Sequence, residues 1–268
     1  MVRKTLRGAM QMLGEAFIVG ETIESALARG QSNPNLSLCS FDVLGEGART
    51  DADAQRYSDS YAAAIDALSA QPEGTVHSRS SISVKLSALE PRYTLLQSAR
   101  VSERLVPRML DLARHAARAG IGLTIDAEEA DRLDLSLDIM EALARDPQTL
   151  GWNGLGLAIQ AYGRRAPLVI DWIAELARDA GRRMTVRLVK GAYWDSEIKR
   201  AQERGLASFP VYTSKAATDA SYLVCAQHLF AAGDVIHPQF ATHNAYTIAA
   251  VLDFAPAGAA YEFQRLHG

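Results

Sequence analysis

The chain has 268 residues, of which 48% are hydrophobic and 22% are charged, and its net charge is −3. This composition supports a large buried core and excludes disordered and collagen-like proteins. The charge gives no basic excess for wrapping nucleic acid, and no apolar run approaches the ~18 residues that span a bilayer. Two cysteines, Cys39 and Cys225, are too few for a disulfide scaffold and fit a reducing cytoplasm. The N-terminus has basic residues but no continuous apolar stretch, so we expect no signal peptide.

Residues 1–35 are predicted to form a helical arm, because apolar residues from Leu6 to Phe17 recur at helical spacing. A loop with the sequence SNPN ends this segment. Residues 36–268 then alternate short apolar strands with helices, which is typical of a parallel sheet with helical crossovers. The predicted strands cover residues 36–42, 82–86, 121–126, 155–160, 184–189, 238–242 and 260–264.

The predicted strands carry two different faces. In the second strand, Ile82 and Val84 alternate with Ser83 and Lys85, and the next three strands alternate in the same way. Strands of a doubly wound sheet are usually apolar on both faces, whereas here one face suits helices and the other suits water or a ligand. The pattern therefore favours a (β/α)₈, TIM-like barrel over an open sheet.

The number of strands is one short of a closed barrel. A barrel of this type needs eight strands, and seven precede the last residue, Gly268. We expect a barrel that is truncated before its eighth strand and helix. The alternative is a strand missed in the N-terminal segment, although that segment has a helical pattern.

Polar residues stand at the carboxyl ends of the predicted strands, where barrels of this class hold their reacting groups. These residues are Asp42, Lys85, Asp126, Gln160, Arg187, His243 and Gln264. Each alone could be a solvated loop residue, but together they predict a shared polar site. Because Asp126 is in phase with Lys85 and Arg187, we expect a carboxylate that faces two cations.

The segment 187–194 is the densest in such groups. Gly191 would let a ligand approach the backbone closely, and Tyr193 and Trp194 offer flat faces to a ring or pack the loop onto the barrel rim. Thr242, His243 and Asn244 follow the sixth strand with a hydroxyl, an imidazole and an amide. Asn244 also suits the cap of the next helix.

Two other kinds of barrel enzyme stay open on the residues alone. His237, His243 and His267 could converge with Asp126 on a metal, although their spacing is unspecific. Lys85 or Lys190 could form a Schiff base with a carbonyl substrate. The chain has neither the G-x-G-x-x-G dinucleotide fingerprint nor a P-loop.

Several segments, in order along the chain, closely resemble one family, the proline dehydrogenase domain of proline utilisation A. They include SISVKLSAL at 81–89, IDAEEADR at 125–132, GWNG at 151–154, IQAY at 159–162, RLVKGAYWDSEIK at 187–199, QFATHN at 239–244 and YEFQRLHG at 261–268. The resemblance runs almost from end to end.

The resemblance implies a distorted (β/α)₈ barrel that holds FAD noncovalently at the carboxyl ends of its strands. Proline would transfer a hydride to flavin N5 and become Δ1-pyrroline-5-carboxylate, and the electrons would pass to a membrane quinone, so peripheral membrane contact is implied too. Bacterial members carry a second domain that completes oxidation to glutamate with NAD. DNA binding, in some members, belongs to an N-terminal domain that this chain lacks. Nothing in the sequence indicates an oligomeric state.

The resemblance also implies roles for individual residues. Arg187 looks like the residue beside flavin N5, Lys85 like a cation near the substrate carboxylate, Asp126 like part of the acid–base network around Lys85, and Tyr193 like a wall of the substrate pocket. The positions that line the flavin are Gln160, Arg187, Val189, Gly191, Trp194, Thr213, Thr242, His243, Asn244, Gln264 and Leu266. No metal is implied.

The sequence departs from the family pattern at its end. The last barrel helix of the family carries two arginines that grip the carboxylate of proline, and that segment lies beyond Gly268. We therefore expect the isolated chain to bind proline poorly, and an inactive fragment is the alternative to an enzyme.

Overall fold

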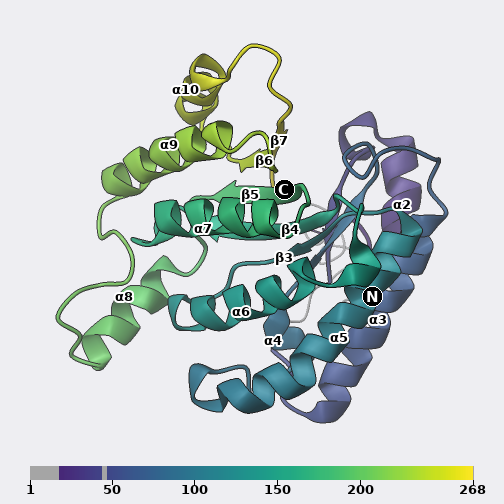
Figure 1. The fold of residues 1–268 in the computed structure, drawn as a ribbon, viewed down its shortest axis with the longest axis horizontal. Helices are drawn as coiled ribbons and strands as arrows, with labels where there is room; N and C mark the ends of the chain where they lie inside the picture. Colours follow the sequence, from purple (N-terminus) through teal and green to yellow (C-terminus); the bar gives the residue numbers. More distant parts are fainter. Residues whose placement is uncertain (1–17, 44–46, 268) are drawn as a thin grey trace, which may run out of the picture.

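The computed structural model describes residues 18–43 and 47–267 (Figure 1). The helical periodicity between Leu6 and Phe17 lies outside these residues. The described part of the arm contains the helix α2, Ile23–Ser32, and the 3₁₀ turn η1, Pro34–Leu36. From β1 onward, strands alternate with helices as predicted.

The strands are β1 (Ser40–Asp42), β2 (Ser81–Val84), β3 (Leu123–Ile125), β4 (Leu155–Gln160), β5 (Met184–Val189), β6 (Ile236–Ala241) and β7 (Glu262–Gln264). The helices that follow α2 are α3 (Asp51–Ser69), α4 (Leu86–Leu89), α5 (Ser98–Ala119), α6 (Leu133–Ala144), α7 (Ala166–Asp179), α8 (Trp194–Glu203), α9 (Lys215–Ala231) and α10 (Ala245–Phe254). Three more 3₁₀ turns are η2 (Leu95–Gln97), η3 (Ala130–Arg132) and η4 (Pro147–Thr149).

The strands form one parallel sheet in the order β1-β2-β3-β4-β5-β6-β7. This sheet is strongly curled, because the side chain of Arg187 on β5 reaches Ser40 on β1 at 2.6 Å and Ser83 on β2 at 2.7 Å. In a flat sheet, four strand spacings would separate β1 from β5 by about 19 Å. The prediction of a barrel-like sheet is therefore confirmed, with helices packed on the outside of the curled strands (Figure 1).

The outer face of the curled sheet is apolar, as the strand pattern predicted. Ile82, Leu123 and Leu188 are fully buried and pack into one core with Leu105 of α5 and Leu229 of α9. Each such side chain contributes roughly 1.5–3 kcal/mol through burial. The inner face carries the small or polar phase, including Ser83, Thr124, Thr185 and Gln239. The helices therefore hold the barrel together, and its interior is left for polar chemistry.

Helix ends follow local sequence signals. Thr50 caps α3 through a capping box with Asp53, and Gly120 ends α5 in the left-handed conformation at φ 65°. The side-chain oxygen of Asn244 caps α10, because it accepts a hydrogen bond from Thr247 N at 2.9 Å.

Some predicted strand bounds were wrong. The first strand begins at Ser40 rather than residue 36, because Pro34–Leu36 forms a 3₁₀ turn that Asn33 caps. Leu86 belongs to the short helix α4 rather than to β2. The sixth strand begins at Ile236, before Pro238, and β7 pairs with it only from Gln239 onward. The missing N–H of Pro238 is therefore not needed by the β6–β7 ladder.

Both cysteines are free, as expected, and burial raises the pKa of the Cys225 thiol to about 11. Such a thiol serves packing rather than nucleophilic chemistry. Among the described residues, none of the helices has the length and the apolar composition that crossing a bilayer requires.

Candidate active site

Four charged side chains meet at the carboxyl ends of the strands. Lys85 Nζ lies 2.6 Å from Asp42 Oδ2 and 3.2 Å from Asp126 Oδ2. The other oxygen of Asp126 lies 3.1 Å from Arg187 Nη1. The side chains of Lys85, Arg187 and Asp126 are 10%, 11% and 15% exposed. The predicted carboxylate between two cations is therefore present, and with Asp42 the described part of the cluster contains two charges of each sign.

Local structure sets the position of Lys85. It directly follows β2 and precedes α4, and its backbone N–H donates to the hydroxyl of Tyr61 at 3.1 Å. Tyr61 is completely buried in α3, so this bond ties the strand end to the helix layer. Burial by itself would lower the pKa of Lys85, but the carboxylates of Asp126 and Asp42 raise it above its ordinary value. The ammonium is thus held charged.

The guanidinium of Arg187 is fixed from several strands. Besides Asp126, it donates to Ser83 on β2 at 2.7 Å, to Ser40 on β1 at 2.6 Å and to Gln264 on β7 at 2.8 Å. An arginine is always protonated and has five N–H donors in a planar fork. Contacts on this many sides give Arg187 a fixed orientation inside the curled sheet.

Gln160 connects the end of β4 to the loop after β5. Its amide nitrogen donates to the carbonyl of Glu128 at 2.8 Å, and its amide oxygen accepts from Ala192 N at 2.9 Å. In the same loop, Gly191 has φ 145°, and a Cβ there would lie 2.4 Å from the ring of Tyr162. Only glycine fits this position. The loop therefore passes the strand ends with exposed backbone.

The remaining predicted flavin-lining positions lie at the carboxyl ends of β5, β6 and β7 or in the segments that follow them. Val189 ends β5, where its carbonyl accepts from Ala161 N at 2.8 Å. Trp194 is 41% exposed, and its ring N–H donates to Tyr212 O at 2.9 Å. Thr213 is exposed on the loop between α8 and α9. Tyr193, which was predicted to be a pocket wall, is partly buried and precedes α8.

The end of the chain approaches the residues that follow β6. His243 Nε2 accepts from the backbone N–H of Leu266 at 3.2 Å, and both residues are exposed. Thr242 is partly buried, and its hydroxyl accepts from Asn244 N at 3.1 Å. The structure therefore brings Lys85, Asp126, Arg187 and Gln264 together through direct contacts, whereas Thr213 is exposed on the loop between α8 and α9.

The sequence did not single out several supporting residues. The Glu128 carboxylate accepts from Ser87 N at 3.0 Å and from Arg132 at 2.7 Å, and the Glu197 carboxylate accepts from Ala130 N at 2.7 Å. Ser40 and Ser83 hold Arg187, although only Ser83 was recognised as part of the polar phase. Acidic residues at the start of a helix are explained by the helix macrodipole alone, so the sequence did not indicate that Glu128 accepts hydrogen bonds from Ser87 and Arg132.

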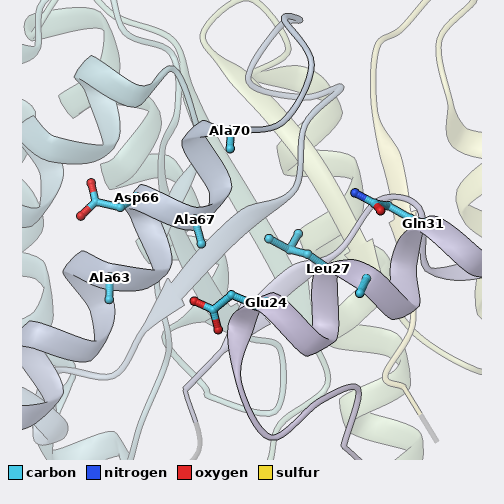
Figure 2. A pocket seen from close by; sticks show the side chains of 8 residues that line it. Glu24, Leu27, Gln31, Ala63, Asp66, Ala67 and Ala70 are labelled. Atoms are coloured by element: carbon cyan, nitrogen blue, oxygen red, sulfur yellow. The ribbon is translucent and has the colours of Figure 1, made fainter.

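The described surface includes two hollows that bear on the location of the site. One of about 380 Å³ adjoins the cluster, because Asp126, Gln160 and Tyr162 line it together with Arg132 and Phe209. The other, of about 540 Å³, lies between α2 and α3 (Figure 2). Its lining residues are Glu24, Leu27, Ala28, Gln31, Ala63, Asp66, Ala67 and Ala70. None of these stands at a strand end, so the smaller hollow is the one that belongs to the site.

The metal alternative finds no support in the geometry. His237 lies near the amino end of β6 and stacks on His77, whereas His243 follows the carboxyl end of the same strand. Six residues of a strand separate their backbones by about 20 Å. Within residues 18–43 and 47–267, no three His, Cys, Asp or Glu side chains are placed to hold a metal ion.

The Schiff-base alternative is also disfavoured. Lys85 lies between two carboxylates that favour its charged form, and a charged ammonium is not a nucleophile. Lys190 forms an ion pair with Asp219.

The groups at the rim fit a flavin. Arg187 offers a fixed cation, Gln160 and Gln264 offer amides, and Trp194 offers an exposed aromatic face. The Gly191 backbone allows close approach to the strand ends. Together these supply the positive charge and the hydrogen bonds that a protein uses to tune a flavin ring.

Comparison with known proteins agrees with this picture. The family profile of proline dehydrogenase matches residues 26–268. The chain is 51% identical to the bifunctional protein PutA of Salmonella typhimurium and 50% identical to PutA of Escherichia coli, with all of the chain covered. It spans about a fifth of the length of these relatives, 21% in each case.

Solved structures show the same likeness. A mutant of proline utilization A from Bradyrhizobium japonicum superposes with a TM-score of 0.90 at 55% identity, covering 99% of this chain and 27% of that one. Proline utilization A from Bdellovibrio bacteriovorus, inactivated by N-propargylglycine, also gives 0.90, at 30% identity, covering 98% of this chain and 29% of that one. On the profile match and these identities, the chain belongs to the proline dehydrogenase family.

Proposed function

We propose that this chain is the FAD-dependent domain that oxidises L-proline to Δ1-pyrroline-5-carboxylate, the first step of proline breakdown to glutamate. The observation that carries the proposal is the guanidinium of Arg187, held at the carboxyl end of the curled sheet by Asp126, Gln264 and two serines. A fixed cation in a largely buried setting suits a reaction in which negative charge develops on a cofactor. Family membership supports the choice of proline.

Bound FAD would supply the two-electron acceptor for the hydride that leaves the ring carbon beside the proline nitrogen. The chain's own groups would place that carbon. Lys85 would provide positive potential for the substrate carboxylate, and Asp126 would keep Lys85 and Arg187 from repelling each other. Tyr193 would form a wall of the pocket, and Gln160 would hold the 190–193 loop against the rim.

Among the described residues, the two cations of the cluster face two carboxylates. Lys85 would therefore attract a substrate carboxylate only in part. This balance agrees with the expectation that further cations, which the family carries on its last barrel helix, hold the carboxylate of proline. We therefore propose that residues 1–268 alone bind FAD but bind proline weakly.

We further propose that the natural protein passes its electrons to a quinone and works in the cytoplasm, with peripheral contact at the membrane. DNA binding, if the natural protein has it, would belong to residues outside this chain. A metal- or Schiff-base-dependent barrel remains the competing class of function. Its distinguishing feature would be activity without FAD.

The first test is a visible absorption spectrum of the purified natural protein after incubation with FAD and desalting. We expect a retained flavin spectrum that bleaches when proline is added without oxygen. Retained flavin with no bleaching would contradict proline as the substrate, and no retained flavin would contradict the cofactor. The same experiment on residues 1–268 should retain flavin and need far more proline to bleach.

A further inference from the structure

One carboxylate lies behind Arg187, on the side away from the ion-pair cluster. Glu262 begins β7, and its side chain is 25% exposed. The amide nitrogen of Gln264 donates to Glu262 Oε1 at 2.6 Å, and the amide oxygen of Gln264 accepts from Arg187 Nε at 2.8 Å. Glu262, Gln264 and Arg187 therefore form a row of hydrogen bonds across the barrel interior.

Glu262 and Arg187 together determine the orientation of the Gln264 side-chain amide between them. An ionised carboxylate can only accept hydrogen bonds, and a guanidinium can only donate them. Gln264 satisfies both neighbours in one orientation alone, with its nitrogen toward Glu262 and its oxygen toward Arg187. A neutral amide at position 262 could either donate or accept, so the opposite orientation of Gln264 would become available.

The surroundings keep Glu262 ionised. Burial by itself would raise the pKa of this carboxyl, but the imidazole of His237 and the amide of Gln264 lower it, with a smaller contribution from His77. His237 Nε2 lies 3.7 Å from Glu262 Oε2, and the rings of His77 and His237 stack with their centroids 3.8 Å apart. A carboxylate in this setting remains an acceptor at neutral pH.

We propose that Glu262 is a positioning residue, which acts through Gln264 to hold the guanidinium of Arg187 toward the cofactor ring. The proposal rests on the function proposed above, because the cation at Arg187 matters through the reduced cofactor that it stabilises. The other neutral acceptors of Arg187, Ser40 and Ser83, can donate as well as accept and so do not fix its orientation in this way.

The test uses the natural full-length protein loaded with FAD and the variant Glu262→Gln, which keeps the shape of the side chain and removes its charge. We expect the preference for reduced over oxidised flavin to fall about tenfold, which is a midpoint potential lower by about 30 mV for a two-electron couple. The rate of anaerobic flavin reduction at saturating proline should fall by a similar factor, and KM for proline should stay within about twofold.

Two controls separate positioning from general damage. Glu262→Asp keeps the charge, so it should recover most of the potential. Glu175→Gln removes a charge on the exposed surface of α7 and should change neither quantity. An unchanged midpoint potential in Glu262→Gln, with FAD bound, would overturn the proposal.

A double variant tests the route through Gln264. In a Gln264→Leu background, Glu262→Gln should lower the potential no further, because the amide that it orients is gone. Effects that add in full would overturn the route. Should Glu262→Gln not fold, Gln264→Leu alone must lower the potential, and an unchanged value would count against the proposal. Wild-type protein that binds no FAD contradicts the proposed function instead, so the two failures are distinguishable.

Discussion

The interior of the curled sheet differs between its two ends. At the carboxyl end, Lys85, Asp126 and Arg187 each lie within 3.2 Å of an opposite charge. At the amino end, His77 and His237 stack on each other, and the nearest carboxylate oxygen is 3.7 Å from His237. Within the described residues, His237 Nε2 has no hydrogen-bond partner. Within the described residues, ion pairs of 3.2 Å or less join the charges at one end, and the His237–Glu262 contact at the other end is longer.

This difference indicates where pH can act. At the carboxyl end, the carboxylates of Asp126 and Asp42 raise the pKa of Lys85, so its ammonium stays charged near neutral pH. At the amino end, burial and the neighbouring His237 and Arg183 lower the pKa of His77 to about 4, partly opposed by Glu262. The carboxyl end is therefore built for fixed geometry, and the opposite end contains His77, which titrates in mild acid.

Asp126→Asn should cause the largest loss of stability at the carboxyl end. It removes the shared carboxylate and leaves two largely buried cations, Lys85 and Arg187, with less compensation. We expect the free energy of unfolding to fall by about 3 kcal/mol in urea titrations followed by fluorescence. The matched change Asp42→Asn, in a carboxylate that is 38% exposed, should cost about 1 kcal/mol. Equal losses would mean that the position of Asp126 between Lys85 and Arg187 adds no stability beyond that of an ion pair such as the one made by Asp42.

Gly191→Ala tests the backbone of the loop at the same, carboxyl end of the sheet. The added methyl group would meet the ring of Tyr162 at 2.4 Å, at a φ of 145° that other residues rarely adopt. We expect a loss of about 2 kcal/mol and weaker FAD binding, measured by fluorescence titration of the apoprotein. Gly205→Ala is the control, because Gly205 has φ 60° and no atom within 4 Å of the new Cβ. Unchanged FAD affinity in Gly191→Ala would remove this loop from the flavin site.

Periodicity predicted the longer elements and the centre of the site. The bounds of β4 and β5 agree with the prediction, because apolar residues alternate with small or polar ones along the whole of each strand. β6 has the same length, but Pro238 interrupts its pattern and its predicted start was wrong. The same alternation placed Asp126 in phase with Lys85 and Arg187, and these side chains are in contact. Strands of three residues, such as β1 and β7, contain too little alternation for their bounds to be predicted.

Contacts between distant segments could not be predicted in this way. Ser40 and Arg187 lie 147 residues apart in sequence and meet only because the sheet curls. The hydroxyl of Tyr61, on a helix face with an apolar pattern, binds the backbone of Lys85. Alternation assigns a residue to a face of the sheet, but which strands face each other across the interior depends on curvature, and the sequence pattern does not encode it locally.

His77→Phe tests the amino end, where we expect the smallest effect. Above about pH 6.5, the ordinary pKa of a histidine, His77 is neutral in both the folded and the unfolded chain. Between pH 6.5 and about 4 the unfolded chain takes up a proton that the folded chain does not, so the free energy of unfolding falls as the pH decreases. Phenylalanine keeps an aromatic ring against His237 and removes this titration. The loss of stability between pH 7 and pH 4.5 should therefore be smaller in the variant by about 1 kcal/mol, after allowing for screening by solvent. A variant that loses as much stability as the wild type would show that the acid sensitivity arises elsewhere, and the contrast between the two ends would then rest on geometry alone.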